Sequence, residues 1–193
     1  MPVTPARPDR ALTPAGERLL DAACELFYAR GIRAVGVDEV ANVAGTTKKT
    51  LYDQFRSKDR LVAAYLRRRA KLWRAFVGSH LDEHAAEPGA ERVLAVFDSA
   101  RAWHQRHSRG CAFVNAWAEL GGTDHPGCAV VLEEKRWMRT LFVQLVMATP
   151  SADPDLGPRL DLLYEGALVA ATAGGQADAF EHARAAAATL LGR

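Results

Sequence analysis

Long apolar stretches are missing from this 193-residue sequence. A membrane-spanning helix needs roughly 20 consecutive apolar residues, and no segment approaches that length. The opening residues, MPVTPARPDR, also lack the apolar run of a secretory signal peptide. We therefore expect a soluble, cytoplasmic protein that makes no contact with a membrane.

Cysteine is scarce as well. The chain has three cysteines, Cys24, Cys111 and Cys128, and no two of them form a CxxC pair. This wide spacing favours reduced thiols over a disulfide framework or a zinc ribbon. We interpret all three as core or pocket residues.

Recognised catalytic and metal-binding motifs are missing too. Two histidine pairs have the spacing that shares a helix face, but neither has a clear third ligand: His80 with His84, and His104 with His107. There is no GxSxG motif and no phosphate-binding loop, and one possible acid–base set matches no catalytic spacing: His104, His107, Cys111 and Glu119. We expect no metal site, no cofactor and no enzyme activity.

Strand-like alternation of useful length is absent, whereas apolar residues spaced three and four apart recur along the chain. This pattern predicts an all-α protein. Thr47 and Ser57 are candidate helix N-caps, and Gly31 is expected to end the first helix in a left-handed conformation. The expected helices are Pro14–Arg30, a short one from about 37 to 44, Lys48–Phe55, about 58–80, and roughly 89–108, 112–121, 126–148, 156–174 and 176–191.

Positive charge gathers at one end of the chain. Residues 1–75 hold 15 Lys/Arg against 8 Asp/Glu, a net +7, and residues 76–193 hold 10 against 15, a net −5. A nucleic-acid-binding head joined to a body that avoids DNA would show this asymmetry, and so would a chance excess of solvated arginine. Residues 1–12, with three prolines and no periodicity, are expected to form a disordered basic arm.

A helix-turn-helix is predicted between about Gly36 and Phe55. Such a motif needs a small residue in its first helix, a glycine in the turn and apolar residues that fix the helix angle. Ala41, Gly45 and Leu51 meet these needs. The polar N-terminal half of the second helix would then face base edges in the major groove.

Three short motifs surround this segment: an AxELFxxxG-like helix end at 23–31, an AxxAG turn at 41–45 and LYxxFxSKxxL at 51–61. With them, about residues 14–66 resemble the DNA-binding domain of the TetR/AcrR family of bacterial regulators. The resemblance implies an N-terminal three-helix bundle with a helix-turn-helix, residues 13–60, joined to a larger helical ligand-binding and dimerisation domain, residues 61–193. The helix at about 58–80 would connect the two.

The resemblance also implies roles for individual residues. Thr47, Tyr52 and Lys58 occupy positions that contact phosphates, and the start of the second helix falls where family members read bases. Gly36 stands where the family has a phosphate-touching Thr, and Thr46 replaces the usual Val of the turn. The complete predicted DNA-binding set is Gly36, Thr46, Thr47, Lys48, Lys49, Thr50, Tyr52, Gln54 and Lys58.

The remaining chain is expected to bind an unidentified small-molecule effector and a second copy of itself. RGCAFVNAWAEL, residues 109–120, resembles a segment that recurs in one branch of the family. Aromatic and polar-tipped residues of the middle helices are the candidate ligand-binding residues, or else simply core: Phe97, Trp103, His104, His107, Cys111, Phe113, Trp117, Trp137 and Tyr164. For a four-helix dimer contact, with intramolecular packing as the alternative, the candidates are Leu162, Leu163, Ala167, Leu168, Ala170, Ala171, Phe180, Ala183, Ala187, Leu190 and Leu191.

Taken together, the sequence predicts a transcriptional regulator that binds double-stranded operator DNA. The leading hypothesis is a homodimeric repressor that a small molecule releases from its operator. An activator, or a ligand-independent DNA-binding protein of the same fold, remains the alternative, and a small-molecule enzyme is a distant third.

Overall fold

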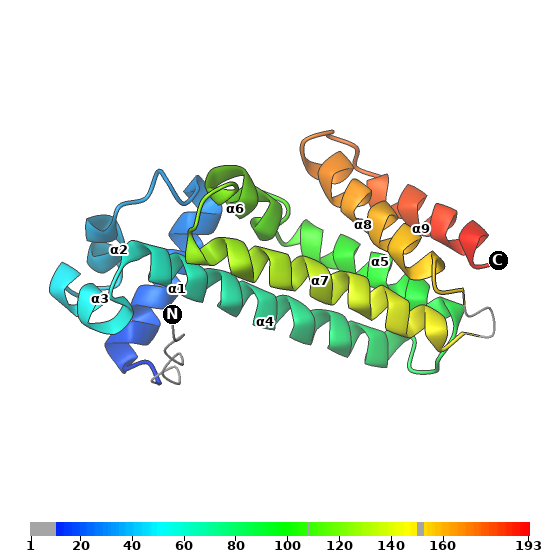
Figure 1. Cartoon of the computed structure of the whole chain (residues 1–193), viewed down its shortest axis with the longest axis horizontal. Helices are drawn as coiled ribbons and strands as arrows, with labels where there is room; N and C mark the ends of the chain where they lie inside the picture. Colours follow the sequence, from blue (N-terminus) through cyan, green and yellow to red (C-terminus); the bar gives the residue numbers. More distant parts are fainter. Residues whose placement is uncertain (1–10, 108, 150–152) are drawn as a thin grey trace, which may run out of the picture. The chain divides into compact units, whose positions relative to one another are not determined.

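A computed structural model describes residues 11–107, 109–149 and 153–193, and these ranges contain helices and no strands (Figure 1). The predicted all-α class is confirmed. Most of the predicted basic arm, residues 1–10, lies outside the described residues. Within them, no helix is long and apolar enough to span a bilayer. The helices are α1 Pro14–Arg30, α2 Val37–Val43, α3 Lys48–Phe55, α4 Lys58–His84, α5 Ala90–Gln105, α6 Ala112–Leu120, α7 Pro126–Met147, α8 Leu156–Thr172 and α9 Ala179–Leu190.

The chain divides into two compact units, and the division falls inside α4. Unit 1 ends at Tyr65 and unit 2 begins at Leu66. The helix that joins them runs from Lys58 to His84, about one turn beyond its predicted end near residue 80. Because one uninterrupted helix contributes to both units, its first turns belong to one core and its remaining turns to the other.

Unit 1 is built from α1, α2, α3 and the beginning of α4. Helix α1 begins with Thr13, whose side chain accepts a hydrogen bond from the backbone N–H of Gly16, and Pro14 follows at a position where no N–H is needed. The apolar residues spaced along these helices converge on one core, in which Leu19, Val40 and Leu51 are fully buried.

Gly31 ends α1, as predicted, but not in the left-handed helical conformation. Its φ is 93°, which favours glycine, and its ψ of 154° is extended rather than helical. The N–H of Gly31 still donates to the carbonyl of Phe27 at 3.0 Å. The extended ψ then directs the chain into the turn before α2.

Unit 2 contains the rest of α4 and the helices α5 to α9. Helix α8 packs against both α7 and α9, α5 packs against α9 and α7, and α6 packs against α7. The core is strongly aromatic and aliphatic, with Phe97, Phe142 and Leu160 fully buried at its centre.

The predicted ends of α5 to α9 are correct to within about three residues. Helix α5 stops at Gln105 instead of 108, because the N–H groups of Arg106 and His107 bond three residues back, to Trp103 and His104. Helix α9 starts at Ala179 instead of 176. The N–H of Gln176 donates to the carbonyl of Ala170, so residues 176–178 belong to the turn between α8 and α9.

Over half of the apolar residues that we assigned to a dimer contact belong to the core of unit 2 instead. Helices α8 and α9 pack on each other and on their neighbours, so one apolar face of each turns inward. Leu162 and Leu190 are exposed, at 72% and 44%. The buried members are Ala167, Leu168, Phe180, Ala183, Ala187 and Leu191, and the half-buried members are Leu163, Ala170 and Ala171.

Candidate nucleic-acid interface and ligand cavity

Helices α2 and α3 of unit 1 are joined by a tight turn. The N–H of Thr46 donates to the carbonyl of Ala41 at 2.9 Å, and Gly45 takes a φ of 60° that suits glycine. Ala41 is buried, so its small side chain permits a close approach of the two helices. Local sequence therefore sets the geometry of the helix-turn-helix.

Helix α3 begins at a side-chain cap. Thr47 Oγ1 accepts a hydrogen bond of 3.1 Å from the N–H of Thr50, which confirms the predicted cap. The hydroxyls of Thr47 and Thr50 also lie 2.9 Å apart. The remaining free N–H groups and the positive end of the helix dipole make this end attractive to a phosphate.

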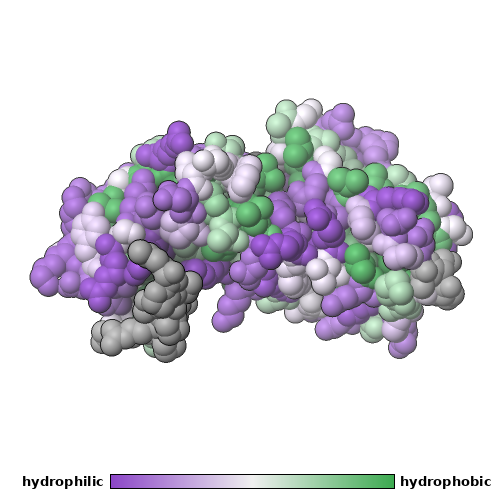
Figure 2. Space-filling model, in the orientation of Figure 1, coloured by the Kyte–Doolittle hydropathy of each residue, from purple (hydrophilic) through white to green (hydrophobic). Residues whose placement is uncertain are grey.

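The side chains that follow the cap are mostly exposed. Lys48, Lys49 and Tyr52 are exposed and Thr50 is half-buried, while Leu51 and Phe55 face the core. In Figure 2 the surface at the α3 end of unit 1 is largely hydrophilic. The helix thus presents its N-terminal half to solvent and anchors itself by the opposite face.

Both exposed lysines are engaged in ion pairs in the free protein. Lys48 Nζ lies 2.9 Å from Asp38 of α2, and Lys49 Nζ lies 2.9 Å from Asp53 of α3. The hydrogen bond to Asp38 raises the pKa of Lys48. Exposed pairs of this kind are weak, so a phosphate or a base edge can compete for either ammonium group.

The other predicted DNA-binding residues have more structural contacts than we expected. Gln54 Oε1 accepts a hydrogen bond of 3.3 Å from the N–H of Thr13 and so holds the start of α1. Lys58 Nζ donates to the carbonyl of Ile32 at 2.7 Å and lies 5.9 Å from the centre of the Phe27 ring. These two polar groups thus tie separate segments of unit 1 together.

Gly36 precedes α2, and Thr46 lies in the turn between α2 and α3. Gly36 is the N-cap of α2 and makes no side-chain cap, since it has no side chain. Thr46 is half-buried in the turn. Sequence reasoning missed Arg18, whose Nε donates to the carbonyl of Ala44 at the end of α2. No local sequence pattern predicts this hydrogen bond, because the two residues are 26 positions apart.

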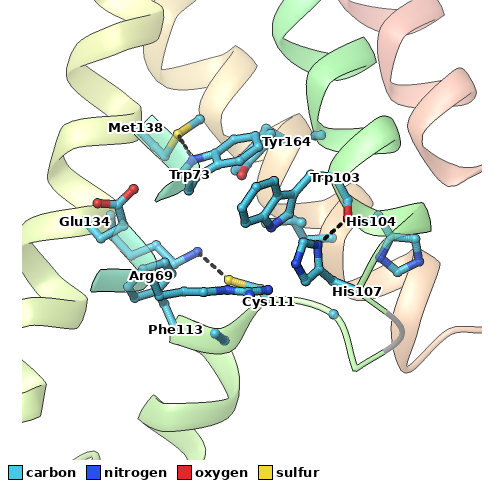
Figure 3. Close-up of a pocket in the computed structure, with 15 residues that line it drawn as sticks. Arg69, Trp73, Trp103, His104, His107, Cys111, Phe113, Glu134, Met138 and Tyr164 are labelled. Atoms are coloured by element: carbon cyan, nitrogen blue, oxygen red, sulfur yellow. Dashed lines mark hydrogen bonds between the residues drawn. The ribbon is translucent and has the colours of Figure 1, made fainter. Parts of the chain in front are cut away.

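Unit 2 contains a cavity with largely apolar walls, to which several aromatic rings contribute. Its empty space is about 520 Å³, including the part that opens to solvent. Figure 3 shows Glu134 on one side and Trp103 with His107 on the other, with Trp73 and Met138 above. The lining residues come from α4, α5, α6, α7, α8 and the segment before α6, so residues far apart in the sequence meet here.

Two thirds of the predicted ligand-binding residues line this cavity. The structure brings together Trp103, His104, His107, Cys111, Phe113 and Tyr164. The other three lie outside it: Phe97 is fully buried in the core, Trp117 is exposed, and Trp137 packs under the guanidinium of Arg74. Sequence periodicity shows which residues face inward, but it does not distinguish a cavity wall from solid core.

Several lining residues were not among the predicted set. Arg69 stacks over the ring of Trp103 at 5.1 Å, and Trp73 Nε1 donates to the sulfur of Met138 at 3.2 Å. Glu134 and Lys135, neighbours on α7, also line the space. Glu134 lies in the charged run 133–136 of α7, so the local sequence does not mark it as the member that the structure buries.

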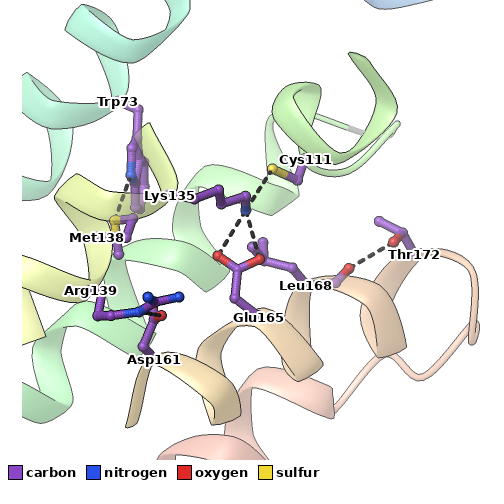
Figure 4. Close-up of polar contacts among 9 residues, drawn as sticks. All are labelled: Trp73, Cys111, Lys135, Met138, Arg139, Asp161, Glu165, Leu168 and Thr172. Atoms are coloured by element: carbon purple, nitrogen blue, oxygen red, sulfur yellow. Dashed lines mark hydrogen bonds and ion pairs between the residues drawn. The ribbon is translucent and has the colours of Figure 1, made fainter. Parts of the chain in front are cut away.

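Ion pairs join α7 to α8 beside the cavity (Figure 4). Lys135 Nζ lies 2.8 and 2.7 Å from the two carboxylate oxygens of Glu165 and 3.7 Å from Cys111 Sγ. Arg139 Nε donates to Asp161 at 3.2 Å. The positive charge of Lys135 is therefore already balanced by Glu165.

Burial shifts the pKa of several cavity residues toward their neutral forms. Desolvation raises the pKa of Glu134, opposed by Arg74, and it raises the pKa of Tyr164 well above its ordinary value. Desolvation also lowers the pKa of His107. Among the described residues, no group of three or more His, Cys, Asp or Glu side chains could hold a metal ion.

Comparisons with known proteins follow the same division of the chain. The family described as "Bacterial regulatory proteins, tetR family" matches residues 19–65, which lie in unit 1. SCO4454, a TetR-family transcriptional regulator from Streptomyces coelicolor, is 31% identical in sequence to this chain, and its crystal structure superposes with a TM-score of 0.82. The match covers 93% of this chain and 89% of the SCO4454 chain. The chain belongs to the TetR family. The predicted family and the predicted two-part helical architecture are confirmed.

Curated relatives of this TetR-family chain differ in how much they share with it. An uncharacterised HTH-type transcriptional regulator from Mycobacterium tuberculosis is 29% identical over 109 residues, so the chain spans about half of that relative, 53%. The HTH-type transcriptional repressor KstR2 from Mycolicibacterium smegmatis is 29% identical over 163 residues, 81% of this chain and 77% of the relative. The HTH-type transcriptional activator FasR from the same species is 49% identical over 51 residues, 26% of this chain and 23% of the relative.

Proposed function

We propose that this TetR-family protein is a sequence-specific DNA-binding transcriptional regulator, acting in the cytoplasm as a homodimeric repressor. The observation that carries the proposal is helix α3. It is capped by Thr47 and anchored through Leu51, and it presents Lys48, Lys49 and Tyr52 to solvent. A helix with this polar edge matches the recognition helix of a helix-turn-helix, whose N-terminal residues contact base edges in the major groove.

Repression is favoured over activation by the extent of similarity. The repressor KstR2 aligns with 81% of this chain, whereas the activator FasR aligns with 26%. The longer alignment must extend into the part that would receive an effector. An activator, or a DNA-binding protein without a ligand, remains the second candidate, since a helix-turn-helix serves either role.

DNA selection tests the core of the proposal. Purified protein would be used to select bound sequences from random oligonucleotides, and affinity for the selected site would be compared with random competitor DNA over a range of salt. We expect preference for the selected site and a steep fall of affinity with salt, because bound phosphates release counterions. Equal affinity for both DNAs, or a flat salt dependence, would contradict it.

Substitutions then separate base reading from phosphate binding. Lys48→Ala should reduce affinity for the selected site by about tenfold and relax its preference, since a good base contact discriminates by about 1–3 kcal/mol. Tyr52→Phe, which removes only a hydroxyl, should weaken binding to selected and random DNA alike. Equal losses on both DNAs for both variants would reject this division of roles.

Lys58→Ala needs a stability control. We propose that Lys58 contacts a phosphate, but its ammonium also bonds to the Ile32 carbonyl at 2.7 Å. The variant should therefore weaken all DNA equally and also lower the thermal midpoint. Lys49→Ala, whose ion pair lies within α3, provides a control with little expected loss of stability.

A second copy of the chain would cover the outer face of α8 and α9. Leu162, Val169 and Leu190 are exposed there at 72%, 48% and 44%, and Gly166 has open space around it. Figure 2 shows hydrophobic patches among hydrophilic side chains over these helices. A dimer would bury this face and present two recognition helices to successive half-sites of an operator.

Sedimentation would test the dimer. Leu162→Glu should produce monomers and weaken operator binding, because it places a charge in the contact. Leu132→Glu is the matched control: Leu132 is exposed at 47% on α7, which is not one of the two helices of the proposed contact, and its variant should remain dimeric. Dimers of Leu162→Glu that are as stable as the unmodified protein would place the contact elsewhere.

We assign the effector to the cavity of unit 2. Its largely apolar lining, with several aromatic rings and a few polar groups, suits a small organic molecule. The ligand would act by binding the DNA-competent and DNA-incompetent states with different affinity. A compound that stabilises the protein thermally and releases it from DNA would support this assignment, and Trp103→Ala should weaken both effects.

A further inference from the structure

Glu134 is the most unusual side chain in the cavity. Its residue is 2% exposed, yet it is an acidic residue in the lining of a largely apolar cavity. One carboxyl oxygen, Oε2, lies 2.7 Å from Nη2 and 2.8 Å from Nε of Arg74. The other oxygen, Oε1, is buried and has no hydrogen-bond partner among the described residues.

An unsatisfied buried acceptor is costly, and this one is avoidable. Leaving such a group without a partner destabilises the folded state, and more strongly when the group is charged. The neighbouring Glu165 shows the ordinary solution, because Lys135 binds both of its oxygens. Glu134 contacts Arg74 through Oε2 only, so this ion pair does not explain why Oε1 is also buried.

Asp161 provides a comparison that shows what is particular about Glu134. Asp161 also has a buried oxygen without a partner, Oδ1, but Asp161 does not line the cavity. Glu134 does line it, on the side opposite Trp103 and next to Met138 (Figure 3). A group inside the cavity can therefore complete the hydrogen bonding of Glu134.

The rest of the lining indicates the shape of that group. Trp73, Trp103, Phe113 and Tyr164 offer ring faces and edges, and Leu168 and Met138 add apolar surface. Trp73 lies 5.6 Å from Trp103 and 6.5 Å from Tyr164, centre to centre, so these rings form one continuous wall. Flat ring systems pack favourably on such walls.

We propose that the effector is an aromatic ring compound whose N–H or O–H group donates a hydrogen bond to Oε1 of Glu134. This rests on the proposed function of the cavity as the effector site. Glu134 is then a specificity-determining residue: it accepts compounds with a donor and rejects those that are isosteric but lack one, because the latter leave the buried Oε1 unpaired.

Two matched pairs of probes test the donor. The neutral pair is 2-naphthol and 2-methoxynaphthalene. The cationic pair is 1-naphthylmethylamine and its N,N,N-trimethyl derivative, which keeps the charge but has no N–H. Affinities would be measured by calorimetry on the full-length protein. We expect the donor to bind at least about tenfold more tightly than its methylated partner in at least one pair.

The two pairs also distinguish the sources of the donor. A preference in the neutral pair alone assigns a hydroxyl-type effector, and a preference in the cationic pair alone assigns an amine. Either result supports the proposal. Absence of any preference for the donor, including failure of all four probes to bind, would overturn it.

Substitutions attribute the preference to Glu134. Glu134→Leu should abolish or reverse the preference for the donor, whereas Glu134→Gln, which keeps an acceptor oxygen, should retain part of it. Asp161→Asn is the control, because it changes a buried unpaired oxygen outside the cavity and should leave the preference intact. A preference that persists unchanged in Glu134→Leu would contradict the assignment.

Folding and DNA binding are checked separately. Circular dichroism and the thermal midpoint would show whether loss of the Arg74 partner disturbs the fold, and the preference ratio itself is insensitive to a partial loss of folded protein. DNA affinity without ligand tests the regulator function on its own. If operator binding is intact but no donor preference appears, only the assignment of Glu134 fails.

Discussion

Replacing Gly36 with threonine should improve both stability and DNA binding. Gly36 is the N-cap of α2 with φ −85° and ψ 157°, a conformation that threonine readily adopts. No atom lies within 4 Å of the position a Cβ would take. A hydroxyl there could accept from the N–H of Asp38 or Glu39, and Glu39 stands at the third helical position, as in a capping box.

The expected magnitude has two parts. A threonine cap is worth a few tenths of a kcal/mol over glycine, and loss of glycine's freedom in the unfolded chain adds about 0.4–1 kcal/mol. The sum is about 1 kcal/mol, which for a protein of this length corresponds to a rise of about 2–4 °C in thermal midpoint. Thermal and urea unfolding would measure it.

DNA binding provides the second measurement. The family resemblance implies that a threonine at this position contacts a phosphate. Gly36→Thr should then raise affinity about tenfold on the selected site and on random DNA alike. The dependence of affinity on salt should stay the same, because a hydroxyl adds no charge.

Gly36→Ala is the matched control, since it restricts the chain but offers no hydroxyl. It should be less stable than Gly36→Thr by about 1 kcal/mol and should bind DNA no better than the parent protein. Two observations would refute the reasoning: equal stability of the two variants, or a gain in DNA affinity that appears on the selected site only.

Three further outcomes are expected. Arg56 follows α3 with φ 69° and ψ −36°, a conformation that costs non-glycine residues about 1–3 kcal/mol. Arg56→Gly should therefore stabilise the protein by about 1 kcal/mol, measured by urea unfolding. A destabilised variant would contradict this. His107 has a lowered pKa, chiefly because it is partly buried and lies near Arg69 and Arg106. The folded state therefore favours neutral His107, and the free energy of unfolding should fall as the pH drops below 6.5, the ordinary pKa of histidine. His107→Gln should reduce this loss of stability. Identical pH profiles for the variant and the parent protein would disprove the contribution. Phe97→Ala should cost about 3–5 kcal/mol because Phe97 is fully buried, but it should not alter probe preference in the cavity, from whose lining it is absent.

Much of unit 1 could be predicted because its determinants are local. The cap at Thr47, the glycine at 45 and the apolar spacing of α1 each act within a few residues. The bounds of α1 and α3 were accordingly correct. Gln54 and Lys58 show the limit of that reasoning: their polar groups bond to segments 41 and 26 residues away, which no local pattern specifies.

The sequence by itself determined the all-α class, the family and the polar edge of α3, since helix periodicity, capping and a short motif are properties of neighbouring residues. Only the tertiary structure decided which inward-facing residues of unit 2 form the cavity. It placed Trp103, His107 and Tyr164 around one space and Phe97 in solid core, and it brought Glu134 among them. A cavity exists where helices distant in sequence fail to fill the space between them, so its walls depend on packing across the whole unit.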